Sequence, residues 1–326
     1  MTVTLVVLAA CLLVSTLLLR RLAHPLLQRA WPAVAVPTLA VGALLNAGTL
    51  LVLGGLLTLA VAARWSLVAD LGGWSTQELT LNVPVPLLVG VPTALVSSVL
   101  GARAAWRAGR LMVLLCRSDR LSRRLRAGGS PVVFVDDTPA DAFTVAGVRG
   151  CVVISRALFA ELDTQERRVL LGHELSHLRR RHHLYVHAVD LAAAANPFLA
   201  PAGAAIRAGV ERWADEDAAI ACGRRPSSGR ALARTALVQA ALRRAAGVPA
   251  MGCSTSVLCA TAGGVSERVR ALLADPRPRR SGLMVGLSVL TVVTVSLGLA
   301  CTVLVHDGFE NSELDCAHAA QAAGSS

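Results

Sequence analysis

Four long stretches without a charged residue restrict the fold of this chain more than any other feature. They cover residues 2–19, 33–63, 81–102 and 282–305. A helix of about 20 apolar residues crosses the hydrocarbon core of a bilayer, so the stretches predict about four transmembrane helices. No basic residue precedes the first stretch, as it would in a signal peptide, so we expect an uncleaved anchor. The composition agrees, since 54% of the residues are hydrophobic and only 16% are charged.

The 32 basic residues, all of them Arg, predict how these spans are oriented. With four spans, Arg64 alone falls on the side opposite to the other arginines. Because Arg-rich loops remain in the cytoplasm, residues 103–281 should be cytoplasmic and both termini outside. Residues 306–326 contain acidic residues and no Arg, as expected of a short extracytoplasmic tail. The net charge of +11 is better explained by topology than by a nucleic-acid partner, and we expect none.

A metal-binding pattern lies in the cytoplasmic segment. Residues 173–177 read H-E-L-S-H, on a helix that Asp163 or the next residue can cap. At helical spacing His173 and His177 are one turn apart on the same face, so both imidazoles can reach one ion. Glu174 lies beside them and suits a general base that takes a proton from a zinc-bound water.

A catalytic zinc ion usually has a third protein ligand and one open position. The best downstream donor is Glu211, on a second predicted helix, where Asp215 lies one turn further on and can orient an imidazole. Asp190, Glu216 and Asp217 are the other acidic residues nearby. Spacing alone does not choose among them.

The pair H-E-L-S-H and E-R-W-A-D, the latter at residues 211–215, resembles the membrane-bound gluzincin metallopeptidases. Two families share this pattern, the HtpX/Ste24-like peptidases (M48) and the BlaR1/MecR1-like peptidases (M56). The resemblance covers residues 130–220 in detail and the spans in outline. The short spans and the Asn196-Pro197 break favour the M56 branch.

The resemblance implies which residues form the active site. Carried over to this sequence, it implies one zinc ion per chain, bound by His173, His177 and Glu211. Glu174 would be the general base, and Asp215 would be the supporting carboxylate.

These patterns together predict a mainly α integral membrane protein with a cytoplasmic α+β zinc peptidase domain of the gluzincin type. The domain contains a small β-sheet, with strands at 131–135 and 151–154, and an edge strand can align the substrate backbone. The expected organisation is listed in chain order: a membrane region at 1–110 with three spans, the peptidase domain at 111–281, a span at 282–305 and the tail at 306–326.

The apolar segment 184–206 needs a separate interpretation. A single crossing would place Glu211 across about 30 Å of hydrocarbon from His173 and His177, so the three could not share an ion. If Glu211 is a ligand, the segment is a re-entrant or interfacial hairpin broken at Asn196-Pro197. The active site then lies near the inner membrane surface.

The predicted function is a membrane-embedded zinc metalloendopeptidase that hydrolyses peptide bonds of membrane or membrane-proximal cytoplasmic proteins. The alternative is a catalytically silent receptor or scaffold that retains the peptidase fold. A transporter is disfavoured, because the spans lack paired ionisable residues. About twenty residues after Val305 cannot form the sensor domain of BlaR1-like receptors, so any sensing would require a separate sensor or repressor protein.

The remaining histidines and cysteines carry weaker signals. His182 and His183 follow three arginines and are expected to be solvated. Cys253 and Cys259 face a reducing cytoplasm in this topology, so we expect no disulfide between them. The absence of C-x-x-C gives no support to a structural thiolate zinc site.

Overall fold

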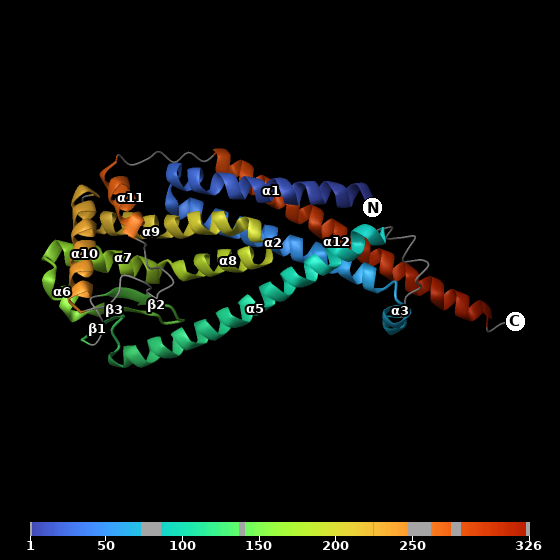
Figure 1. Ribbon diagram of the computed structural model, residues 1–326, viewed down its shortest axis with the longest axis horizontal. Coiled ribbons are helices and arrows are strands. Elements are labelled where there is room, and N and C mark those ends of the chain that lie inside the picture. The colour runs from blue at the N-terminus through green and yellow to red at the C-terminus, as the bar shows by residue number, and fades with distance from the viewer. Residues whose placement is uncertain are drawn as a thin grey trace.

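The computed structural model describes residues 2–72, 86–136, 141–223, 225–246, 262–274 and 282–323, which are mainly helical with one three-stranded sheet (Figure 1). The elements, in chain order, are α1 (Thr2–Arg29), α2 (Pro32–Ala62), α3 (Ser66–Gly72), α5 (Leu87–Leu125), a 3-10 turn (Arg126–Gly128), β1 (Val132–Val135), β2 (Ala142–Val145), β3 (Cys151–Ser155), α6 (Arg156–Glu161), α7 (Thr164–Arg179), α8 (His182–Ala195), a second 3-10 turn (Pro197–Leu199), α9 (Ala200–Cys222), α10 (Arg225–Ala245), α11 (Ala262–Leu273) and α12 (Gly282–Ala323).

Long apolar helices form one end of the molecule, and the sheet with α6, α7, α10 and α11 forms the other (Figure 1). Within the described ranges, three helical segments are long and apolar enough to cross a membrane: Val7–Arg29, Pro32–Ala62 and Leu87–Leu125. The apolar part of α12, Met284–Ala300, is shorter. The chain is therefore a membrane protein by composition, with three candidate spans where the sequence predicted about four.

Three predicted spans have different boundaries in the structure. The first, predicted at residues 2–19, lies in α1, which continues to Arg29. Residues 81–85, at the start of the predicted third span, lie outside the described residues. From Leu87 the helix is continuous to Leu125, so α5 is about 58 Å long and exceeds the thickness of a bilayer core. Helix α12 does not end at residue 305 but continues to Ala323, through most of the predicted tail.

Small residues allow the long helices to pack closely. A Cβ atom on Gly54 of α2 would lie 2.5 Å from the Oγ of Ser97 on α5. A Cβ atom on Gly298 of α12 would lie 2.6 Å from the Cγ2 of Thr49 on α2. Contacts of this kind are typical of helices that associate within a bilayer, where small side chains let the backbones approach.

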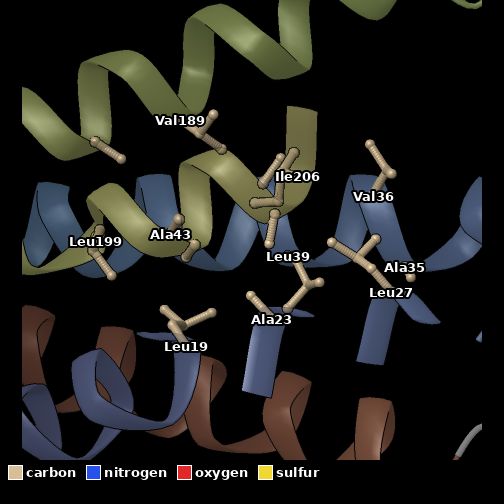
Figure 2. Packing of buried hydrophobic residues seen from close by; sticks show 14 of the residues in the cluster. Leu19, Ala23, Leu27, Ala35, Val36, Leu39, Ala43, Val189, Leu199 and Ile206 are labelled. Atoms are coloured by element: carbon tan, nitrogen blue, oxygen red, sulfur yellow. The ribbon is translucent and has the colours of Figure 1, made fainter. Parts of the chain in front are cut away.

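Helices α8 and α9 form a hairpin that packs on α1 and α2 (Figure 2). The largest buried cluster joins Val189 of α8 and Ile206 of α9 to Leu27, Leu39 and other residues of α1 and α2. The hairpin thereby joins the membrane helices to the end of the molecule that contains the sheet.

Buried polar residues hold the tip of this hairpin. At the reversal, the side-chain amide of Asn196 donates to Thr16 Oγ1 of α1 at 3.1 Å and to Asn46 Oδ1 of α2 at 3.2 Å. The amide of Asn46 donates in turn to Ser15 Oγ at 2.6 Å. These bonds satisfy polar groups that would otherwise be costly among apolar helices.

The sheet has the order β1–β3–β2, with β1 parallel and β2 antiparallel to β3. Every residue of β3 is buried, since α6 and α7 cover one side through a cluster that includes Leu158 and Leu170. Strand β2 is an edge strand and lies against α7. This position places Thr144 beside the H-E-x-x-H residues.

Candidate metal centre

Helix α7 begins at a complete capping box, so its register is well defined. The Asp163 carboxylate accepts hydrogen bonds from the backbone N–H groups of Gln165 and Glu166, both at 2.8 Å. The Glu166 carboxylate accepts the N–H of Asp163 at 2.9 Å. Such caps stabilise a helix by about 1 kcal/mol. From this start, helical geometry places His173 and His177 on one face.

Helix α9 contributes the second set of site residues and is anchored on the C-terminal end of α1. A Cβ atom on Gly209 would lie 2.6 Å from the Cδ2 of Leu27. The guanidinium of Arg212 donates to the carbonyl oxygens of Leu27 and Gln28 at the end of α1, at 2.6 and 3.2 Å. Glu211 lies between these two anchors.

Three of the predicted site residues converge. The Nε2 atoms of His173 and His177 are 3.1 Å apart, and each lies 3.6 Å from a carboxylate oxygen of Glu211. Among the described residues, these three are the His, Cys, Asp or Glu side chains placed to share a metal ion.

The alternative acidic residues have other partners. Asp190 pairs with Arg107 and Arg207, and Glu216 pairs with Arg225. Asp217 accepts hydrogen bonds from Ser176 and Arg180 at 2.8 and 3.1 Å. Glu211 is thus the carboxylate that the fold places beside both imidazoles.

The geometry of the three residues fits a zinc ion. Zinc binds nitrogen and oxygen at about 2.0–2.2 Å, so ligand atoms in a tetrahedral site lie about 3.3–3.5 Å apart. The observed separations of 3.1 and 3.6 Å bracket this value. In addition, Glu211 Oε1 is buried and accepts no hydrogen bond within the described part of the chain. A buried carboxylate oxygen requires a donor or a cation, so the donor set suits a divalent metal.

Asp215 orients His173 from the opposite side of the ring. Its Oδ1 lies 2.9 Å from His173 Nδ1, which leaves Nε2 facing His177 and Glu211. Burial alone would lower the pKa of His173, but the Asp215 and Glu211 carboxylates outweigh it and raise this pKa to about 10. Without a metal, His173 is therefore protonated at neutral pH, and metal binding releases that proton.

Glu174 is buried beside the two histidines and is held by β2. The Thr144 hydroxyl lies 2.9 Å from Glu174 Oε2 and 3.0 Å from the Glu174 carbonyl oxygen. Burial raises the pKa of Glu174, although the His173 charge and the Thr144 hydroxyl oppose the shift. A carboxylate with a raised pKa is a stronger proton acceptor, as a general base requires.

Arg268 of α11 is a site residue that sequence reasoning missed. Its Nη1 lies 3.1 Å from Glu211 Oε2, and its Nε and Nη2 donate to both Asp215 oxygens at 2.7 and 2.6 Å. The side chain is only 11% exposed. The sequence signal that could have identified Arg268 as buried is its position one turn before the buried Leu272, on a short amphipathic helix.

The prediction that His182 is solvated is wrong. His182 is fully buried, with its Nδ1 2.9 Å from His177 Nδ1 and its ring packed at a tilt against Trp213 at a centroid distance of 4.8 Å. The preceding arginines are exposed instead. Arg181 adopts a left-handed backbone conformation with φ 52°, and this turns the chain so that His182 lies beneath the end of α7. His183 is partly buried.

Comparison with known proteins supports one of the two families that the sequence suggested. A protein-family model described as Peptidase family M48 matches residues 114–254, a range that contains both halves of the donor set. The M48 resemblance is therefore confirmed, whereas the M56 option, which the sequence favoured, is not. No curated protein and no solved structure showed significant similarity to the chain.

Proposed function

We propose that this chain is a membrane-embedded zinc metalloendopeptidase, because a model of Peptidase family M48 matches residues 114–254. Its substrates would be membrane proteins or membrane-proximal cytoplasmic proteins. The observation that carries the proposal is the convergence of His173, His177 and Glu211, with Glu174 beside them. The match to Peptidase family M48 supports metallopeptidase activity, and the roles of the individual residues are part of this proposal.

Each side chain of the site has a defined task in this proposal. His173, His177 and Glu211 would hold the zinc ion, which would supply Lewis-acid polarisation of the scissile carbonyl and lower the pKa of water. Glu174 accepts a proton from the attacking water and returns it to the leaving amine. Asp215 holds His173 in the orientation that presents Nε2.

Strand β2 offers a binding site for the substrate backbone. One edge of β2 pairs with β3, and none of the described strands pairs with its other edge. An extended peptide added to that edge would run past Thr144, which contacts the proposed base Glu174 directly. This supports endopeptidase action on extended segments of protein substrates.

The position of α9 supports a membrane-proximal substrate. Glu211 lies next to Arg212, which binds the end of α1, so the site lies close to the end of a candidate span. The Arg distribution assigns this end to the cytoplasmic side. We therefore infer that the catalytic domain faces the cytoplasm at the inner membrane surface.

The test is a comparison of Glu174→Gln with wild type, both purified as the full chain in detergent. We expect the variant to retain about one zinc ion per chain, measured by mass spectrometry of the metal, while hydrolysis of an unfolded protein substrate falls about 10²- to 10⁴-fold. Glu161→Gln, at an exposed position on α6, is the matched control and should hydrolyse normally. A wild-type protein without stoichiometric zinc, or a fully active Glu174→Gln variant, would refute the proposal.

A further inference from the structure

His182 is a buried polar residue to which the proposed mechanism assigns no task. It is the first residue of α8, and its side chain is fully enclosed. One ring nitrogen, Nδ1, lies 2.9 Å from Nδ1 of His177. The other, Nε2, has no hydrogen-bond partner among the described residues. The contact with His177 is therefore the polar interaction that fixes this ring.

The contact couples the tautomer of His177 to the tautomer of His182. Both rings are buried, and their Nδ1 atoms face each other at hydrogen-bonding distance. A hydrogen bond between two Nδ1 atoms then requires one of them to carry a proton and the other to accept it. If His182 donated, Nε2 of His177 would carry a hydrogen and could not bind a metal.

A metal at the donor set selects the opposite arrangement. Nε2 of His177 faces His173 and Glu211 and must present a lone pair, so its Nδ1 carries the proton and donates it to His182. Metal-binding histidines usually donate this second N–H to a carboxylate, a carbonyl or water. Here a second imidazole occupies that position.

Two further observations indicate that the fold places His182 specifically. The His182 ring packs on Trp213, which belongs to the same turn of α9 as Glu211. Arg181, just before it, is the one non-glycine residue with positive φ in the described part of the chain. This conformation is unfavourable for a residue with a Cβ atom, and it persists only where the surroundings impose it.

We propose that His182 is a positioning residue that accepts the Nδ1 proton of His177 and so holds Nε2 of His177 toward the metal. The inference rests on the metal centre proposed above. It adds a contact from α8 to a site otherwise built from α7, α9, α11 and β2. His182 thereby couples the start of the membrane-associated hairpin to the metal centre.

The test compares zinc affinities of the full chain in detergent, measured by competition with a chromophoric chelator. His182→Leu removes the acceptor, and we expect zinc to bind about 10- to 100-fold more weakly. His182→Asn is close to leucine in size but places an acceptor oxygen near the position of Nδ1, so it should restore most of the loss. His183→Leu, at the adjacent and only partly buried histidine, should bind zinc like wild type.

A second measurement separates positioning from packing. The visible spectrum of the cobalt-substituted protein reports the geometry around the metal, and it should change in His182→Leu but not in His182→Asn. Thermal unfolding of each metal-free variant reports packing on Trp213. If the Leu variant does not fold, His182→Ala takes its place in the comparison with Asn.

The outcomes distinguish this inference from the proposed function. Equal zinc affinities for the Asn and Leu variants would overturn the positioning role, whatever their stabilities. A wild-type protein that binds no zinc would instead refute the metal centre itself. The expected result is weaker zinc binding in His182→Leu, zinc affinity largely restored in His182→Asn, and wild-type zinc affinity in His183→Leu.

Discussion

Gly172 lies so close to Ala218 that a Cβ atom on Gly172 would be 3.2 Å from the Ala218 Cα. The pair joins α7 to α9, the two helices that contribute the donors of the metal centre. Gly172 directly precedes His173 in the chain. The absence of a side chain at this position therefore sets how closely the two imidazoles approach Glu211.

Replacing Gly172 with Val should separate α7 from α9. The obstructing Cα and Cβ atoms of Ala218 cannot rotate away, so we expect a destabilisation of about 1–3 kcal/mol and weaker zinc binding. Gly109→Val is the control, because a Cβ atom on Gly109 of α5 would have no neighbour within 4 Å. Thermal unfolding and zinc titration measure both effects, and unchanged zinc affinity in Gly172→Val would contradict this account.

Removing the Thr144 hydroxyl should move the acidic limb of the pH–rate profile. The hydrogen bond from Thr144 lowers the pKa of Glu174, against the larger raising effect of burial. In Thr144→Val that pKa rises further, so a larger fraction of Glu174 is protonated and inactive at a given acidic pH. The limb should shift to higher pH, with zinc affinity unchanged.

Thr144→Ser keeps the hydroxyl and is the matched control for this change. It should retain the wild-type profile. An acidic limb that stays in place in Thr144→Val would show that Glu174 is not the group titrating there.

The sequence predicted correctly those parts of the molecule whose signal is a pattern among residues close together in the chain. Residues 33–63 were predicted to span, and α2 covers Pro32–Ala62, because an uncharged apolar run of this length is itself the signal. The H-E-x-x-H spacing placed His173 and His177 on one helical face for the same reason. Glu211 came from the motif resemblance, since spacing left several acids open.

The residues that sequence reasoning missed reach the site through long-range packing. Arg268 is 53 residues from Asp215 in the chain, and nothing in its local sequence identifies that partner. His182 follows three arginines and was interpreted by their solvation, but a left-handed turn at Arg181 reverses its direction. Local composition does not encode either contact.

Arg268 should be essential for the stability of the metal-free site. Its guanidinium donates to both oxygens of Asp215, which is 4% exposed. Arg268→Met leaves that buried carboxylate without its strongest partner, and removing one member of a buried ion pair typically costs about 3–5 kcal/mol. Arg270→Met, on the exposed face of α11, should cost much less. Equal unfolding temperatures for the two metal-free variants would contradict the prediction.

The polar contacts at the tip of the α8–α9 hairpin should contribute to stability in detergent. Asn46→Leu removes the acceptor of Asn196 and the donor to Ser15, and we expect a loss of about 1–2 kcal/mol. Thr38→Val is the control, because the Thr38 hydroxyl donates to the carbonyl of Val34 in its own helix. Steric-trapping or thermal unfolding measurements would compare the stabilities of the two variants. An Asn46→Leu variant as stable as wild type would show that these contacts do not contribute to stability.

The metal-free protein should be most stable near pH 6.5, because its buried histidines titrate in opposite directions. The pKa values of His177 and His182 are lowered to about 3, so between pH 3 and 6.5 the unfolded chain binds protons that the folded chain does not. Stability therefore falls on acidification, by about 1.4 kcal/mol per pH unit for each histidine. The pKa of His173 is raised to about 10, so the stability that its proton contributes is present below pH 6.5 and is lost as the pH rises toward 10.

Thermal unfolding of chelator-treated protein across this pH range measures both slopes. His182→Asn removes one of the histidines whose pKa is lowered, so its acidic slope should be shallower by about 1.4 kcal/mol per pH unit, while the alkaline slope stays the same. Bound zinc keeps His173 and His177 deprotonated, so the zinc-loaded protein should lose the alkaline decline. A flat profile in the metal-free wild type would mean that these imidazoles are exposed to water, in disagreement with their burial.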